Sequence, residues 1–201
     1  MILVECDNKE CVPDADDCAR HTGIMGIIRK DVAAMQGIEL LPGKLLHPDA
    51  LGAVTPGTDK HFYSSGAFNL IQLVLYILKQ TGPAHLFLST YSISNESLAT
   101  LVKYRDRGDI LSVRFLIDNR VRTISPKPFD FLVTSFPDDY RCCALHAKVA
   151  LVWNDTWHVS VVGSQNATHN PKLERGIIHT AREIFEFDLK TLCDEFERGS
   201  T

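Results

Sequence analysis

Four polar residues in the C-terminal half have the types and the spacing needed to grip and attack a phosphodiester. His146 and Lys148 are two residues apart, and Ser164 and Asn166 are two residues apart further along the chain. Lysine offers a compact positive charge with three donors, and the serine hydroxyl and asparagine amide offer further donors to phosphate oxygens. Histidine can attack phosphorus or transfer a proton near neutral pH. Such a site needs no metal ion, and we expect no cofactor.

A predicted β-hairpin positions these side chains. Two β-rich runs, 144–153 and 157–163, flank a turn-forming trio at 154–156. Side chains two apart on a strand point to the same side of the sheet, so His146 and Lys148 are predicted to share a face.

The register of this hairpin decides whether the polar groups meet. A three-residue turn pairs Trp153 with Trp157, and this register places His146 opposite Ser164. We therefore expect the polar groups to converge at the open end of the hairpin. The two tryptophans are expected to pack across it.

The spacing of these residues resembles the HKD motif of the phospholipase D superfamily, which is H-x-K followed by G-S-x-N. Here the pattern is His-Ala-Lys at 146–148 and Gly-Ser-Gln-Asn at 163–166. The next residues, ATHNPKLERGII, resemble those of nuclease-like members with a single motif, which carry a glutamate where Glu174 stands. The resemblance is strongest over 144–180 and extends more loosely back to about residue 60.

The resemblance implies a metal-independent phosphodiesterase, namely an endonuclease that binds and cuts DNA or RNA. Its catalytic residues would be His146, Lys148, Asn166 and Glu174. The chain carries one motif and the family's reaction uses two histidines, so the resemblance also implies a homodimer with both His146 side chains at the two-fold axis. One His146 would form a phosphohistidine and the other would protonate the leaving oxygen, with Glu174 holding the useful tautomer.

Two features depart from the family pattern. An aspartate usually stands five residues after the lysine, but here that position is Trp153, and Asp155 is displaced into the turn. The run from His146 to Asn166 is also longer than usual. A catalytically degenerate nucleic-acid-binding module therefore stays open as an alternative. A phospholipid-processing phosphodiesterase is a further alternative, although no basic amphipathic helix is visible and we expect no membrane partner.

Other residues near the motif are predicted to bind substrate. Gly163 and Ser164 belong to the motif itself. Arg120 and Arg122 lie in a basic stretch that suits the tracking of phosphates, although such a stretch is equally typical of a solvated strand end. The basic members of the stretch are Arg114, Arg120, Arg122 and Lys127.

The bulk composition is that of an ordinary soluble globular protein. The chain has 201 residues, of which 45% are hydrophobic and 23% charged, with a formal net charge of −4. This length suits one domain, and a net negative charge argues against a protein that coats nucleic acids generally. The start of the chain has no signal-peptide pattern, and no apolar run is long enough to span a bilayer. We therefore expect a cytoplasmic protein.

The cysteines are expected to be reduced thiols. There are six of them, and a chain with a real core does not need disulfides. Cys6, Cys11, Cys18 and His21 offer four zinc ligands, but their spacing fits no common zinc template, so we predict no metal site.

The central part of the chain predicts an α/β fold with a mixed β-sheet flanked by helices, of the phospholipase D-like half-barrel or sandwich kind. A helix over 68–80 is followed by a strand over 84–92, a helix over 96–108 and a strand over 110–118. The strand–helix–strand order implies a parallel pair joined by a right-handed crossover. Ser64 or Ser65 is predicted to cap the first helix, and Ser94 or Asn95 the second.

The remaining segments are predicted as follows. The whole chain, 1–201, is expected to be a single domain with its core over 61–198. Residues 1–60 are expected to hold short strands and loops, with a short helix near 29–35. A Pro-rich connection over 121–141 is assigned a strand near 129–134. A closing helix is predicted over residues 181–199.

Overall fold

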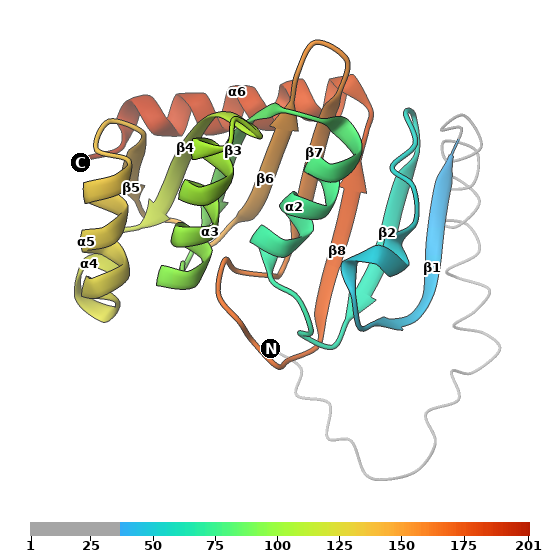
Figure 1. The fold of residues 1–201 in the computed structure, drawn as a ribbon, viewed down its shortest axis with the longest axis horizontal. Coiled ribbons are helices and arrows are strands. Elements are labelled where there is room, and N and C mark those ends of the chain that lie inside the picture. Colours follow the sequence, from blue (N-terminus) through green and yellow to red (C-terminus); the bar gives the residue numbers. More distant parts are fainter. Residues whose placement is uncertain (1–36) are drawn as a thin grey trace, which may run out of the picture. The chain divides into compact units, whose positions relative to one another are not determined.

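The computed structural model of the protein describes residues 37–201, and one eight-stranded mixed sheet runs through them (Figure 1). The strand order is β1-β2-β8-β7-β6-β3-β4-β5, so the sheet is open, with β1 and β5 at its edges. The neighbours β1/β2, β3/β4 and β4/β5 are parallel and the others antiparallel. The strands are β1 (Ile38–Leu45), β2 (Asp59–Ser64), β3 (Ala84–Thr90), β4 (Ile110–Asp118), β5 (Tyr140–Cys143), β6 (Lys148–Trp153), β7 (His158–Gly163) and β8 (Glu174–His179).

Helices cover both faces of the sheet, which confirms the predicted α/β class (Figure 1). The larger hydrophobic core lies on the face covered by α2 and α3, and a smaller cluster around Phe87 and Leu151 lies under α6. No helix between residues 37 and 201 is both long enough and apolar enough to cross a membrane. The helical elements are η1 (Pro48–Leu51), α2 (Leu70–Thr81), α3 (Asn95–Asp106), α4 (Val121–Ile124), α5 (Pro126–Ser135) and α6 (Arg182–Arg198).

The predicted strand–helix–strand unit is confirmed. β3 and β4 are parallel, and α3 crosses between them. Ser94 caps α3, because its hydroxyl accepts from the backbone N–H of Ser97 at 3.2 Å. The buried residues of both strands explain why their sequences are almost continuously apolar.

The predicted cap of α2 is wrong. Ser64 is the last residue of β2, where it pairs with Glu174, and Ser65 lies in the connection that follows. Asn69 caps the helix instead, in a capping box with Gln72. The asparagine side chain accepts from the Gln72 N–H at 3.0 Å, while the Gln72 side chain accepts from the Asn69 N–H at 2.9 Å.

The strand predicted near residues 129–134 is also wrong, because α5 occupies this segment. Two prolines, Pro126 and Pro128, lie in its first turn, where the backbone N–H groups have no partner within the helix. Phe129, Leu132 and Phe136 recur at the spacing of one helix face and pack into the larger core. The aromatic and β-branched residues of this stretch favour strand only when that spacing is ignored.

The predictions made for residues 1–60 fall on both sides of residue 37, where the described part of the chain begins. The strand β1 confirms a short strand predicted before residue 60, whereas β2 begins only at Asp59; both belong to the common sheet. The four candidate zinc ligands and the helix predicted near 29–35 lie outside the described residues. Cys142, Cys143 and Cys193 are free thiols in the part of the chain that the structure describes.

Candidate active site

Most of the predicted site residues meet at one edge of the sheet. β3, β4 and β7 end at this edge, and β6 and β8 begin there, as their parallel and antiparallel pairings require. It is the lower edge in Figure 1, where the long connection from β7 to β8 also lies. Each candidate side chain is therefore at the first or last residue of a strand, or in the loop beside it.

The register predicted for the hairpin is wrong by one residue. Trp153 pairs with His158 and Lys148 with Gly163, so the loop has four residues, 154–157. The Asn154 side chain fixes this loop, because its oxygen accepts from the N–H groups of Thr156 at 3.0 Å and of residue 157 at 2.9 Å.

This register has two consequences. The ladder begins at Lys148, so His146 lies in the loop before the strand and not on its face. The tryptophans do not pack across the hairpin, because Trp153 packs against the cluster under α6 and Trp157 against the larger core on the other face.

His146 and Lys148 are nevertheless in direct contact. The Lys148 ammonium lies 3.2 Å from His146 Nδ1 and donates to the His146 carbonyl at 2.6 Å. A lysine ammonium only donates, so Nδ1 accepts and the ring proton lies on Nε2. Lys148 is buried, whereas the His146 side chain is exposed. In this arrangement the exposed imidazole carries its proton on Nε2.

Glu174 is a buried carboxylate that orders the motif's second half. It accepts from the hydroxyl of Ser164 and from Nδ2 of Asn170 at 2.8 Å. The Ser164 hydroxyl accepts in turn from the N–H of Arg175 at 3.0 Å. Among the described residues no hydrogen bond joins Glu174 to His146, so the predicted hold on the imidazole tautomer is not present in this chain.

The charge of Lys148 is set by its surroundings. Burial lowers the pKa of the Lys148 ammonium, and the negative charges of Glu174 and Asp118 raise it in part. The ammonium thus feels the charges of two buried carboxylates and lies beside an exposed imidazole. This arrangement suits a phosphate group, which would bring a further negative charge to the ammonium.

Asn166 completes the motif from the loop after β7. Its side-chain oxygen accepts from the Thr90 hydroxyl at 3.4 Å, at the end of β3. Its carbonyl accepts from the N–H of Leu70 at 3.1 Å, which ties the loop to the start of α2. Its Nδ2 makes no hydrogen bond to residues 37–201, so these donors are available to a ligand.

The two predicted substrate-binding arginines are separated by the structure. The Arg120 guanidinium lies 4.7 Å above the ring of Tyr91, which is itself 5.5 Å from the imidazole of His146. Arg122 donates to the hydroxyl of Ser200 at 3.3 Å and is not brought to this cluster. The Arg122 guanidinium also lies 5.5 Å above the ring of Phe129 in α5.

Gly163 has a packing role that its sequence neighbours do not reveal. A Cβ at this position would lie 2.5 Å from the side-chain oxygen of Gln165 and 2.8 Å from the carbonyl of Arg175. The glycine therefore allows β7 to approach β8 closely, just before Ser164 and directly opposite Lys148.

The fold has known counterparts. No family model and no curated protein sequence matches the chain. Among solved structures, Nuc from Salmonella typhimurium, a phospholipase D family member, matches with a TM-score of 0.53 and 19% identity. The match covers 71% of this chain and 95% of Nuc. The chain has the phospholipase D fold.

A second counterpart is much larger than this chain. The polyphosphate kinase of Porphyromonas gingivalis matches with a TM-score of 0.56 and 12% identity, over 80% of this chain and 30% of the kinase. The phospholipase D fold is thus shared with a protein of which it forms only a part.

Sequence reasoning missed two residues of the cluster in this phospholipase D fold. Tyr91 follows β3, and Asp118 is the last residue of β4. Side chains at the carboxyl ends of neighbouring parallel strands meet at one edge of a sheet, which is where ligands bind in open α/β sheets. Tyr91 is the last residue but one of the strand predicted over 84–92, and Asp118 is the last of the strand predicted over 110–118, so the signal is present in the sequence.

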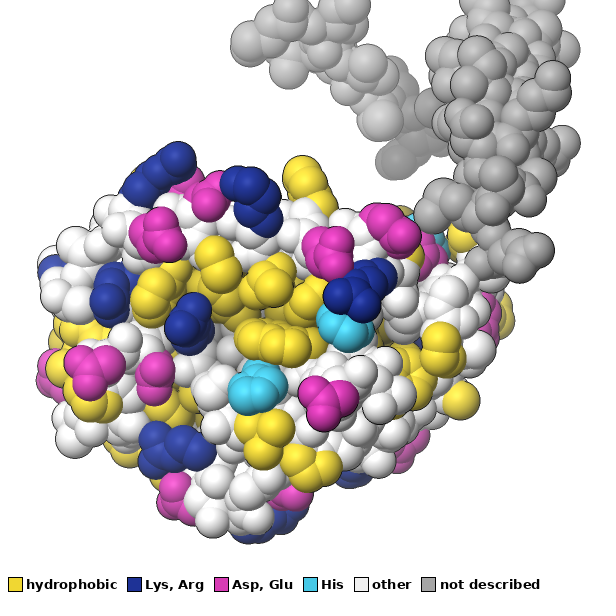
Figure 2. All heavy atoms as spheres, turned by 90° about the horizontal axis from the view of Figure 1, so that it is seen from above, with side chains coloured by type: hydrophobic (Ala, Val, Ile, Leu, Met, Phe, Trp, Pro, Cys, Tyr) yellow, Lys and Arg dark blue, Asp and Glu magenta, His cyan; other side chains and the backbone are white. Residues whose placement is uncertain are grey.

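Trp153, which stands where the family's aspartate is expected, lies far from the cluster. It is at the other end of β6, about 17 Å from Lys148 for five residues of extended strand. Its ring stacks on His85 at 5.4 Å and tilts against Phe185 at 5.8 Å. Figure 2 shows the edge of the sheet that holds the 154–157 loop, where hydrophobic side chains form a central band bordered by charged ones.

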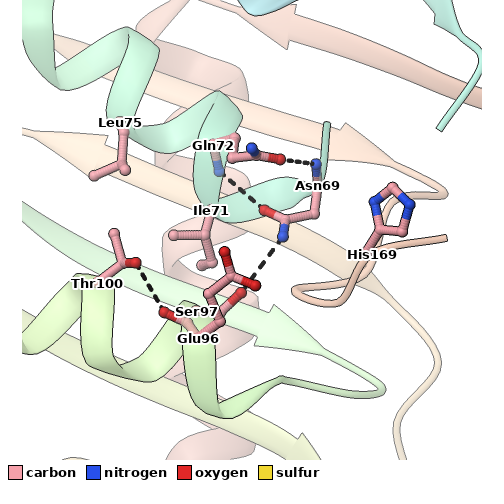
Figure 3. A pocket seen from close by; sticks show the side chains of 8 residues that line it. All are labelled: Asn69, Ile71, Gln72, Leu75, Glu96, Ser97, Thr100 and His169. Atoms are coloured by element: carbon pink, nitrogen blue, oxygen red, sulfur yellow. Dashed lines mark hydrogen bonds between the residues drawn. The ribbon is translucent and has the colours of Figure 1, made fainter. Parts of the chain in front are cut away.

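The motif does not lie in the pocket drawn in Figure 3. That pocket, of about 310 Å³, lies between the first turns of α2 and α3, with His169 at its rim. It contains none of the predicted catalytic residues. Within residues 37–201, no group of three or more Cys, His, Asp or Glu side chains is placed to hold a metal ion. The pocket is lined by Asn69, Ile71, Gln72, Leu75, Glu96, Ser97, Thr100 and His169.

Proposed function

We propose that the protein is a metal-independent phosphodiesterase, a nuclease whose active site is completed by a second copy of the chain. The observation that carries the proposal is the contact between the buried Lys148 ammonium and His146, at the edge where Ser164, Asn166 and Glu174 also lie. The phospholipase D fold supports the proposal, because the chain shares it with Nuc, a phospholipase D family member.

The proposed reaction uses His146 from both copies. The imidazole of one copy attacks phosphorus through its free ring nitrogen, and a phosphorus–nitrogen bond forms as the bond to the leaving oxygen breaks. The imidazole of the other copy, protonated on both ring nitrogens for this step, gives its Nε2 proton to that oxygen and becomes neutral. Water then attacks phosphorus and gives a proton to the second imidazole, which breaks the phosphorus–nitrogen bond and restores both rings.

The remaining residues would stabilise charge on the phosphoryl group. Lys148 provides a desolvated ammonium, and Asn166 provides the amide donors of Nδ2. Fixed donors of this kind stabilise the transition state more than the same groups do in water. Arg120 lies beside Tyr91 at the rim, where it would contact a neighbouring phosphate.

Nucleic acid is the substrate that these rim groups favour. An aromatic ring and a guanidinium beside a phosphate-binding centre suit the bases and the repeated phosphates of a polynucleotide. If the substrate were a phospholipid, the protein would act on vesicles in preference to oligonucleotides. A binding-only module would hold nucleic acid without cutting it.

The proposal is tested with purified protein, bis(p-nitrophenyl) phosphate and a fluorescent oligonucleotide, in the presence of a chelator. Cleavage of both substrates is expected, and His146→Ala should lower turnover by a factor of about 10² or more. His169→Ala is the matched control, since His169 is also exposed and close to the motif. Undiminished turnover in His146→Ala would contradict the mechanism, and binding without cleavage by the unmodified protein would favour the binding-only alternative.

A further inference from the structure

Asp118 is a buried charged group of the cluster that the proposed reaction does not use. Asp118, the last residue of β4, is only 3% exposed. Its Oδ1 accepts from the Arg120 N–H at 3.0 Å and from Arg120 Nε at 2.8 Å, and its Oδ2 accepts from the N–H of Leu145 at 3.1 Å. A buried carboxylate is costly unless it is hydrogen-bonded, and here both oxygens are used.

We infer that Asp118 is the positioning residue of this site, which holds both the loop that carries His146 and the guanidinium of Arg120. The inference rests on the proposed function for its catalytic consequence. The hydrogen bonds that support the inference are present in the structure and do not depend on any catalytic activity.

Asp118 holds one side of the loop that carries His146. His146 precedes the β6 ladder, so no strand pairing fixes its backbone. The loop is held by Leu145 N–H, which donates to Asp118, and by the Ala147 carbonyl, which accepts from the hydroxyl of Ser89 at 3.0 Å. These two contacts lie on either side of His146. Loss of the Asp118 acceptor would therefore free one side of the catalytic loop.

Asp118 also fixes the side chain of Arg120. Its side chain is exposed, and a long exposed side chain normally samples many rotamers. Asp118 binds its backbone N–H and its Nε together, which directs the guanidinium over the ring of Tyr91. Nη1 of Arg120 makes no hydrogen bond within residues 37–201 and is available to a phosphate.

The negative charge of Asp118 also acts on the charged groups near it. The pKa of Asp118 is lowered, first by the hydrogen bond from the Arg120 side chain, so the carboxylate stays ionised. Its charge raises the pKa of the Lys148 ammonium, as that of Glu174 does. The Asp118 carboxylate thus accepts hydrogen bonds from the loop and from the rim arginine. Its charge also favours the protonated form of the buried lysine. Since Trp153 stands at the expected aspartate position, Asp118 supplies a buried acidic group from another strand.

The test compares Asp118→Asn with Asp59→Asn. Asp59 is a similarly buried aspartate, 6% exposed and 2.9 Å from Nδ1 of His179, outside the cluster. Two readouts are needed: kcat and KM across pH for bis(p-nitrophenyl) phosphate, and the NMR titration of the Lys148 side chain with the imidazole signals of His146. The second readout does not depend on turnover.

Asp118→Asn is expected to lower kcat about 10- to 100-fold, the range seen when a supporting residue is removed. It should also move the titration of Lys148 to lower pH and shift the His146 signals, while Asp59→Asn changes neither. A folded Asp118→Asn protein with the original titration and imidazole signals would overturn the inference. If these NMR changes appear but the unmodified protein cleaves no phosphodiester, the positioning role stands and the proposed function fails.

Discussion

The Lys148 ammonium and the Nδ1 atom of His146 lie 3.2 Å apart, and this contact decides which ring nitrogen carries the proton. With Nδ1 accepting, the exposed Nε2 is protonated. In the proposed composite site the attacking copy needs an unprotonated Nε2, and the acid copy needs both ring nitrogens protonated. The proposed reaction therefore assigns different protonation states to the His146 rings of the two copies.

This asymmetry predicts the behaviour of mixed dimers. Unmodified and His146→Ala chains carrying different affinity tags are co-expressed, and dimers with one of each are isolated. A composite site lacks either its nucleophile or its acid in such dimers, so we expect almost no turnover, whereas independent sites would retain about half. A mixed dimer of His169→Ala and unmodified chains is the control. Half activity in the His146 mixed dimer would show that each chain works alone.

The alkaline limb of the pH–rate profile is predicted to depend on Glu174. Burial lowers the pKa of Lys148, and Glu174 raises it in part. Neutralising the carboxylate in Glu174→Gln lowers the pKa of Lys148 further, so the ammonium loses its proton at lower pH. We expect the alkaline fall of kcat/KM to move to lower pH in this variant. Glu96→Gln, at an exposed glutamate of α3, should leave the profile in place.

An unmoved alkaline limb in Glu174→Gln would mean that another group controls it. Direct titration of Lys148 by NMR then separates the two explanations, since the lysine signal should still move if the charge of Glu174 acts on it.

The two rim arginines are predicted to differ in their effect on substrate binding. Arg120→Ala should raise KM for an oligonucleotide about tenfold, because it removes a charge-assisted contact near the scissile phosphate. Arg122→Ala should change KM little, since Arg122 is bound to Ser200. KM is measured at two salt concentrations, and only Arg120→Ala should reduce the salt dependence. Equal effects of the two variants would contradict the assignment.

The start of α2 offers a test of the fold. Asn69→Ala removes the capping box and should lower the free energy of unfolding by about 1 kcal/mol, while Ser65→Ala should change it little. Chemical denaturation of both variants measures the difference. A larger loss for Ser65→Ala would restore the cap predicted from the sequence.

The sequence was sufficient for those features that depend on local patterns. The apolar runs of β3 and β4 and the serine before α3 predicted the parallel unit, and the H-x-K and G-S-x-N spacing predicted which residues meet. The hairpin register failed because it depends on one side chain, Asn154, which closes a four-residue loop. The choice between three and four residues is not visible in turn composition alone.

The rest of the site depends on contacts between distant residues. Asp118 binds Leu145 across 27 positions of the chain, and Arg120 meets His146 only through the ring of Tyr91. No periodicity encodes such contacts. Their only trace in the sequence was the position of Tyr91 and Asp118 at the ends of two predicted strands.

The strand order has a consequence for how activity is acquired during folding. The residues of the cluster come from β3, β4, the start of β6, the end of β7 and the start of β8, and these strands pair across long stretches of sequence. Closing such long loops is entropically costly and slow. Recovery of catalysis after denaturation should therefore lag behind helix formation and report the completion of the whole sheet. A partly folded chain would be helical and inert.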